Sequence, residues 1–201
     1  VATRPIEDFS AYRQKLSELV YNSAFMMKPI FAQAKTAPKR IAYAEGEDLR
    51  VLRAVQIAVD EGLAFPILVG RTAVIEANIK KLGLRLEHGV NIQIVDQEKN
   101  PDYEFFADDY YQIMQRKGVT PEYAHREARR RSTLIAAMLV KHGHADGMLC
   151  GTYSSYDIHL DFVKNVIGLK EGRSTFFTLN ALMLQDRNLF IADTYVNTNP
   201  T

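Results

Sequence analysis

The chain has 201 residues, of which 47% are hydrophobic, so it is long enough to bury the core of one domain or slightly more. Its 25 basic and 24 acidic residues leave a formal net charge of +1, which excludes the strongly basic surface of a dedicated nucleic-acid-binding protein. Cys150 is the single cysteine, so the chain cannot form an internal disulfide. The first 30 residues lack a signal-peptide pattern, and no apolar run approaches the roughly 20 residues of a membrane span. We therefore expect a globular, cytoplasmic protein without nucleic-acid or membrane partners.

The first 37 residues predict a helical leader in two pieces. Apolar residues recur at intervals of mostly three and four, with charged residues between them, at Phe9, Tyr12, Leu16, Leu19, Val20, Phe25, Met26 and Ile30. An amphipathic leader of this kind packs as a lid or an oligomer contact, or it connects the domain to a preceding one. The two interpretations are compatible, and both stay open.

From Arg40 the pattern alternates between short β-prone runs and helical stretches. The order is RIAYAEG, LRVLRAVQIAVDEG, FPILVG, TAVIEANIKKLG and VNIQIVD. This βαβαβ order predicts parallel strands joined by right-handed crossovers, with helices on the faces of the sheet.

The second half of the chain continues the same mixture of helices and strands. Thr120 and Pro121 are typical of an N-cap and a first helical turn. The elements that we expect there are helices at 103–114, from 121 onward and at about 156–166, a strand at 147–150, and β-prone runs at 174–183 and 188–196. The chain is thus predicted to form an α/β fold with a mostly parallel sheet, preceded by the helical leader.

Ligands of open α/β sheets collect at the carboxyl ends of the strands, so the loops there are the candidate sites. The acidic loop 45–48 favours capping of the next helix over catalysis, because carboxylates stabilise a helix N-terminus and repel a phosphate. The loop 70–72 offers a glycine, a cation and a hydroxyl, which suit either a plain turn or an anion site.

The loop after the GMLC strand is the third candidate. A glycine turn, hydroxyl groups and free amides at a helix start form a cradle for a phosphate or a thioester carbonyl. The alternative is a simple loop. The residues concerned are Gly151, Thr152, Tyr153, Ser154 and Ser155.

Other features carry weaker signals. A basic run is typical of a solvated helix face, and the alternative is contact with the 3′-phosphate of CoA or with an acidic subunit face. The residues of this run are Arg126, Arg129, Arg130 and Arg131. His142 and His144 lack further ligands at metal-binding spacing, so we expect no metal site. The motifs of nucleotide-binding loops and of serine esterases are not found in the sequence.

The chain resembles the phosphate acetyltransferase and butyryltransferase family from about residue 38 to its end. The resemblance rests on the blocks KRIAYAEGEDLRVLRAV, FPILVGR, IQIVD, GVTPEYA, HADGMLCGTYSS and LFIADTYVNTNP. The leader text RPIEDFSAYRQKL and FMMKPIFAQA, together with ADTYVN, resembles the branch of the family that is fused to the C-terminal side of bacterial NADP-dependent malic enzymes.

The resemblance implies a three-layer α/β sandwich in two subdomains with an acyl-CoA cleft between them, and a homo-oligomer built through this domain. Residues 1–37 would be the connector from a malic enzyme domain, and residues 38–201 an incomplete first subdomain. The family's catalytic serine and aspartate would then lie beyond this chain. NADP and a divalent metal, Mg or Mn, would belong to the upstream malic enzyme domain, with no cofactor bound by this segment.

One departure from the family pattern bears on activity. Active transacetylases carry an arginine in the helix after the hydroxyl-rich loop, where this sequence has His159, Asp161 and Lys164. An acid in place of a phosphate-binding cation weakens phosphate binding. We therefore expect a non-catalytic domain that senses acetyl-CoA for the attached malic enzyme. The alternatives are an active phosphate acetyltransferase and a purely structural assembly module.

The expected contacts with acetyl-CoA or phosphate combine the hydroxyl-rich loop with three residues farther along the chain. They are Gly151, Thr152, Tyr153, Ser154 and Ser155 from the loop, with Arg173, Asn197 and Asn199 from the C-terminal part.

Overall fold

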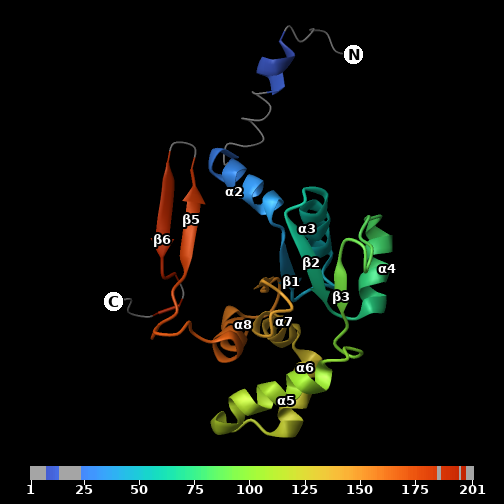
Figure 1. The fold of residues 1–201 in the computed structure, drawn as a ribbon, viewed down its shortest axis with the longest axis vertical. Coiled ribbons are helices and arrows are strands. Elements are labelled where there is room, and N and C mark those ends of the chain that lie inside the picture. The colour runs from blue at the N-terminus through green and yellow to red at the C-terminus, as the bar shows by residue number, and fades with distance from the viewer. Residues whose placement is uncertain (1–7, 14–23, 185–186, 195, 198–201) are drawn as a thin grey trace. The chain divides into compact units, whose positions relative to one another are not determined.

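The structure is a computed structural model that describes residues 8–13, 24–184, 187–194, 196 and 197 (Figure 1). It contains two compact units, one of residues 34–170 and one made of residues 1–33 with 171–201. We describe each unit by itself. The division into a leader of residues 1–37 and a domain of residues 38–201 stays a prediction.

A parallel sheet of four strands forms the centre of the larger unit. The strands are β1 (Lys39–Tyr43), β2 (Ala64–Val69), β3 (Gln93–Val95) and β4 (Gly147–Leu149), in the spatial order β3-β2-β1-β4. Ile41 of β1 lies opposite Pro66 on one side and Gly147 on the other. The βαβαβ prediction from the sequence is therefore confirmed.

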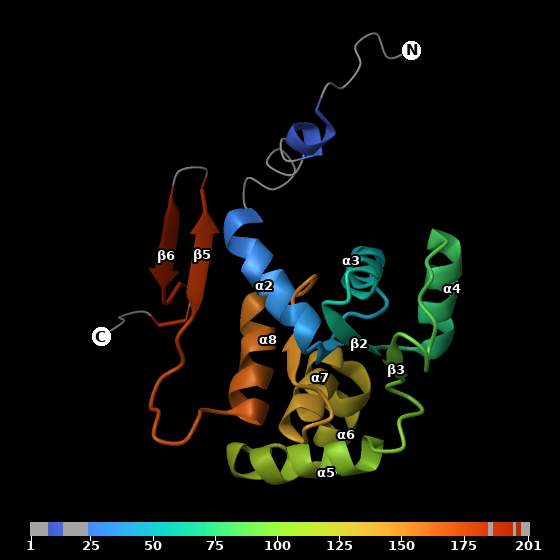
Figure 2. The ribbon, with the colours of Figure 1, turned by 45° about the horizontal axis from the view of Figure 1, so that its top comes forward.

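Helices cover both faces of this sheet, because successive strand side chains point to opposite faces. Ile67 and Val69 of β2 belong to one buried cluster, whereas Leu68 between them belongs to the other. The first cluster includes side chains of α5 (Tyr103–Met114), α6 (Pro121–Arg130), α7 (Ser132–Lys141) and α8 (Tyr156–Phe162), and the second those of α3 (Leu49–Asp60) and α4 (Thr72–Leu82). Figure 2 shows these helices around the sheet. The three-layer α/β prediction is confirmed.

Helix α6 begins where the sequence predicted. The Thr120 hydroxyl accepts a hydrogen bond from the Tyr123 amide at 3.3 Å, and Pro121 occupies the first turn. The helical stretch is then interrupted at Arg131, which has φ −111° and ψ 95°. The break lets α7 turn into the centre of the unit, where every residue from Thr133 to Leu139 is buried.

The remaining elements follow the predicted pattern: α5 has the predicted bounds, and the strands are shorter than predicted. The strand expected at 147–150 ends at Leu149, and α8 continues into the π-helical turn η2 (Val163–Ile167). A 3₁₀ turn, η1 (Gln115–Lys117), follows α5. In the smaller unit, β5 (Leu179–Met183) and β6 (Asn188–Ala192) form an antiparallel hairpin.

Most described residues of the leader are helical. Residues 9–13 are helical, and α2 spans Ala24–Thr36. The break between these two pieces falls outside the described residues. Across the described part of the chain, no helix has both the length and the apolarity that crossing a membrane requires.

Candidate functional site

The candidate site lies where the strand order of the sheet reverses. From β1, the chain adds β2 and β3 on one side, and β4 then pairs on the other side of β1. The loops that follow β1 and β4 therefore leave neighbouring strands in opposite directions, which is the arrangement that opens a ligand crevice in doubly wound folds. The loop after β4 contains Gly151–Ser155, which we call the cleft loop.

Glu45, in the loop after β1, anchors the start of the cleft loop. Its side chain is only 4% exposed, and its Oε1 atom accepts a hydrogen bond from the Gly151 amide at 2.9 Å. One of the amides expected to cradle a ligand is therefore occupied by a buried carboxylate. A phosphate next to this carboxylate would be repelled, whereas a neutral carbonyl would not.

Cys150, between β4 and the cleft loop, is not prepared for nucleophilic chemistry. Burial, and secondly the negative charge of Glu45, raise the pKa of its thiol. The reactive form of cysteine is the thiolate, which a raised pKa disfavours. The thiol therefore stays protonated at neutral pH.

His159 of α8 contacts the middle of the cleft loop through its imidazole ring. The residue is 8% exposed, and its Nε2 atom lies 2.7 Å from the Tyr153 carbonyl. A carbonyl can only accept, so Nε2 carries the hydrogen, and in the neutral ring Nδ1 accepts from the Thr133 hydroxyl at 2.8 Å. The Glu45 carboxylate is 3.9 Å from Nδ1. These contacts link the loops after β1 and β4 through α7 and α8.

The cleft loop itself presents its side chains to solvent. All five of its residues are exposed, and Ser154 has a φ of +74°, a conformation that non-glycine residues adopt uncommonly. The hydroxyls of Thr152, Ser154 and Ser155 make no hydrogen bond with any residue that the structure describes. They remain available to a ligand.

Nothing that the structure defines brings the three other predicted ligand contacts to this loop. Arg173 is exposed and belongs to the smaller unit. Asn197, in the same unit, donates from its side-chain amide to the Phe176 carbonyl at 2.8 Å and to the Asp193 carboxylate at 2.8 and 2.9 Å. Asn199 lies outside the described residues. The involvement of these residues stays a prediction.

The acidic loop after β1 caps helix α3, as the sequence favoured. The Asp48 carboxylate accepts from the amides of Arg50 and Val51 and pairs with the Arg50 guanidinium at 2.8 Å. Arg50 also donates to the Thr152 carbonyl at 3.1 Å, so this cap touches the cleft loop. The hydrogen bonds from Arg50, and those from the two amides, lower the pKa of Asp48 to about 2.

We expect the stabilisation by Asp48 to be present above pH 4 and to be lost as the pH falls towards 2. The reason is that its folded pKa of about 2 lies below the ordinary value of 3.8, so acid protonates it more readily in the unfolded chain. Asp48→Asn keeps the cap but removes the charge, and should cost about 0.5–1 kcal/mol at pH 6 and only a small part of that at pH 2. Urea denaturation at a series of pH values measures this difference. Asp102→Asn, at an N-cap position without a side-chain cap bond, is the control, and an equal pH dependence there would contradict the assignment.

The loop after β2 is occupied by carboxylates of the protein. Arg71 pairs with Glu47 at 2.7 Å, and the Thr72 amide at the start of α4 donates to the Asp96 carboxylate at 2.9 Å. The cation and the helix N-terminus that suited an external anion are thus already engaged. This loop is a turn between strand and helix.

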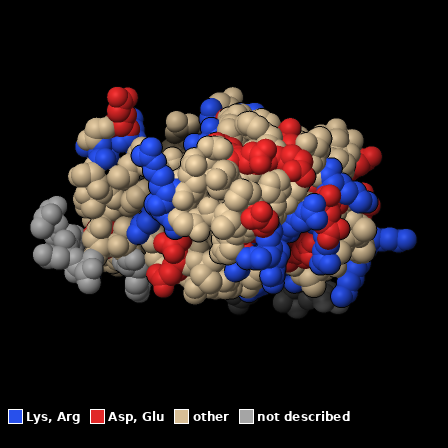
Figure 3. All heavy atoms as spheres, turned by 90° about the horizontal axis from the view of Figure 1, so that it is seen from below, with Lys and Arg blue, Asp and Glu red and all other residues tan. Residues whose placement is uncertain are grey.

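The basic run on α6 also has partners within the unit. The guanidinium of Arg126 lies over the Tyr123 ring at 5.0 Å, that of Arg129 over the Tyr103 ring at 4.9 Å, and Arg131 pairs with Glu127 at 3.1 Å. Basic and acidic side chains alternate on the face that Figure 3 shows. Within the described residues, no cluster of three or more His, Cys, Asp or Glu side chains could hold a metal ion.

These features define a doubly wound, three-layer α/β domain with a hydroxyl-rich loop at its switch point. The model of the phosphate acetyl/butaryl transferase family matches residues 25–201, and the chain belongs to this family. The fold agrees: a phosphotransacetylase from Streptococcus pyogenes superimposes with a TM-score of 0.74 at 25% identity, over 87% of this chain and 54% of that one.

Curated relatives of higher identity are longer than this chain. The chain is 49% identical to an NADP-dependent malic enzyme of Haemophilus influenzae and 50% identical to one of Escherichia coli, with all of this chain aligned to 27% and 26% of theirs. A phosphate acetyltransferase of Synechocystis is 30% identical over 84% of this chain and 24% of its own length. The chain thus spans about a quarter of these relatives.

The buried network of Glu45, Thr133 and His159 has no clear signal in the sequence. Glu45 stands in a loop that favours helix capping, His159 stands where the family pattern has an arginine, and Thr133 begins an apolar run. Only the packing of α7 against α8 brings the hydroxyl to the imidazole.

Proposed function

We propose that this chain is a regulatory and oligomerising domain that senses acetyl-CoA for an NADP-dependent malic enzyme, and that it is not catalytic by itself. The observation that carries the proposal is the identity of 49–50% to such enzymes along the whole chain. The attached domain would oxidatively decarboxylate malate to pyruvate with NADP and a divalent metal.

The cleft loop is the proposed contact for the acyl end of acetyl-CoA. Its exposed hydroxyls and the amides after Gly151 supply donors for a thioester carbonyl. The buried carboxylate of Glu45 at the start of the loop disfavours an anion there. This difference supports a neutral acyl group over a free phosphate as the occupant of the loop.

The environment of α8 supports the absence of transacetylase activity. An active transferase needs a cation there for acetyl phosphate. His159, at this part of the helix, is buried and has both ring nitrogens engaged with Tyr153 and Thr133. Asp161, two residues on, is exposed and brings a negative charge. Both features weaken phosphate binding.

The test is malate-dependent NADP reduction by the full-length protein, with and without acetyl-CoA. Ser155→Phe places a bulky ring on the cleft loop at an ordinary backbone conformation, with φ −85°. We expect inhibition by acetyl-CoA to weaken about tenfold or more, as a clash in a specific contact would cause, with uninhibited turnover unchanged. Ala77→Phe, at an exposed position of α4, adds the same bulk elsewhere and should leave inhibition intact.

The other outcomes separate the alternatives. Unchanged inhibition in Ser155→Phe would put the effector elsewhere, and inhibition that persists after deletion of the whole chain would remove the sensor role. Formation of acetyl phosphate from acetyl-CoA and phosphate would establish the transferase alternative. This activity is worth measuring because some relatives are named phosphate acetyltransferase. Absence of malate turnover would contradict the attachment to a malic enzyme.

A further inference from the structure

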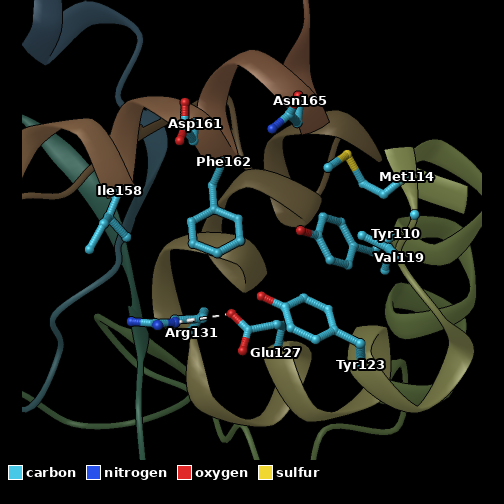
Figure 4. Close-up of a pocket in the computed structure, with 11 residues that line it drawn as sticks. Tyr110, Met114, Val119, Tyr123, Glu127, Arg131, Ile158, Asp161, Phe162 and Asn165 are labelled. Carbon is cyan, nitrogen blue, oxygen red and sulfur yellow. Dashed lines mark hydrogen bonds and ion pairs between the residues drawn. The ribbon is translucent and has the colours of Figure 1, made fainter. Parts of the chain in front are cut away.

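A pocket lies in the outer helical layer of the larger unit, apart from the cleft loop. It has a volume of about 370 Å³, and it opens between α5, α6 and α8 (Figure 4). Its walls are aromatic, apolar and acidic side chains, chiefly Tyr110, Tyr123, Glu127, Ile158, Asp161 and Phe162. None of the predicted ligand contacts lines this pocket, and Asp161 is the one lining residue that also bears on the proposed function.

An unpaired hydroxyl is aimed into the pocket. Tyr110 is 4% exposed, yet its hydroxyl makes no hydrogen bond with any described residue, and Figure 4 shows it pointing into the space beside Phe162. The hydroxyl of Tyr123 points into the same space (Figure 4). A phenol hydroxyl that faces a pocket without a protein partner is free to bond to a polar group that enters the pocket.

The charges at the pocket favour a cation. Glu127 is 7% exposed and pairs with Arg131, whereas Asp161 at the rim forms no ion pair with any residue in the described ranges. Two carboxylates therefore face one guanidinium among the lining residues. Burial first, and then the neighbouring Tyr123, Glu127 and Asp161, raise the pKa of Tyr110 to about 12, so its hydroxyl remains neutral.

The aromatic rings add to the same preference. Tyr110, Tyr123 and Phe162 present three rings to one small volume, and the faces of such rings attract cations. The Tyr123 ring already has a cation, the guanidinium of Arg126, at 5.0 Å. Lys117, which donates to Asn165 on the rim, is not among the residues that line the pocket.

We propose that this pocket binds a small organic cation, a primary ammonium carried on an apolar body. The ammonium would donate to the hydroxyl oxygens of Tyr110 and Tyr123 and lie near the carboxylates of Glu127 and Asp161. The body would pack against Phe162, Ile158 and Met114. A primary ammonium suits the site better than a quaternary one, because only the former donates hydrogen bonds to unpaired phenols.

The test is calorimetric titration of the intact protein with 2-phenylethylamine at pH 7, beside 2-phenylethanol, which has the same shape without the charge. We expect saturable binding of the amine and at least about tenfold weaker binding of the alcohol. Equal binding of both would overturn the cation assignment, and the absence of saturable amine binding would overturn the site.

Variants locate the binding. Tyr110→Phe should weaken the amine about tenfold, because a hydrogen bond to a charged group is lost, and Asp161→Asn about threefold, because Asp161 is exposed. Tyr156→Phe and Asp157→Asn make the same chemical changes on α8 outside the pocket lining and should leave affinity unchanged. Equal losses in both pairs, in proteins with unchanged thermal unfolding, would contradict the assignment to this pocket.

Discussion

Replacement of Phe106 by alanine should lower the free energy of unfolding by about 3–5 kcal/mol, which is the usual cost of removing a fully buried aromatic ring. Phe106 is 0% exposed and is among the largest fully buried side chains of the described chain. Its ring lies 5.8 Å from that of His142 and 5.9 Å from that of Phe105. Urea denaturation followed by circular dichroism measures the loss.

The neighbouring residue provides a matched control. Phe105 belongs to the same helix and is 54% exposed, so Phe105→Ala removes the same ring from a half-solvated place. We expect a loss of about 1 kcal/mol or less, because little apolar area returns to water. Equal losses at the two positions would show that α5 does not bury Phe106 as described.

His159→Phe should destabilise the unit by about 1–3 kcal/mol and loosen the cleft loop. The substitution keeps an aromatic ring but leaves the buried Thr133 hydroxyl and the Tyr153 carbonyl without their partner, and unpaired buried polar groups cost about this much. Denaturation measures the first effect. Faster cleavage after Tyr153 by chymotrypsin measures the second, since loosened loops are preferred sites of proteolysis.

A double-mutant cycle separates the hydrogen-bond network from ring packing. Thr133→Val removes the other partner at similar volume, so the combined variant should lose less stability than the two single losses together. Strictly additive losses would mean that the hydroxyl and the imidazole act independently.

The larger unit could be predicted from the sequence because its signals are local. Alternating β-prone runs and amphipathic stretches marked β1, α3, β2 and α4, and Thr120 with Pro121 marked the start of α6. Strand ends were less predictable, since β5 and β6 are shorter than the apolar runs that contain them. The interruption at Arg131 carries no glycine or proline, so no sequence signal announced it.

The candidate site was only partly predictable, because its parts come from distant segments. The sequence indicated the cleft loop, whose glycine and hydroxyls stand together. It could not show that Glu45 would bind the Gly151 amide across 106 positions, or that α8 would turn His159 under Tyr153. Contacts of this kind depend on tertiary packing, which local patterns do not encode.

The position of β4 in the sheet has a consequence for motion. β4 has three residues and, among the described strands, pairs with β1 alone. Detachment of this edge leaves β1, β2 and β3 joined, so it costs less than global unfolding and defines a separate unit of local opening. The cleft loop is attached to this edge strand. A ligand of the cleft loop that binds only when β4 is paired with β1 would therefore slow amide hydrogen exchange in β4. Ligand binding at the loop would in this way increase the order of the sheet edge.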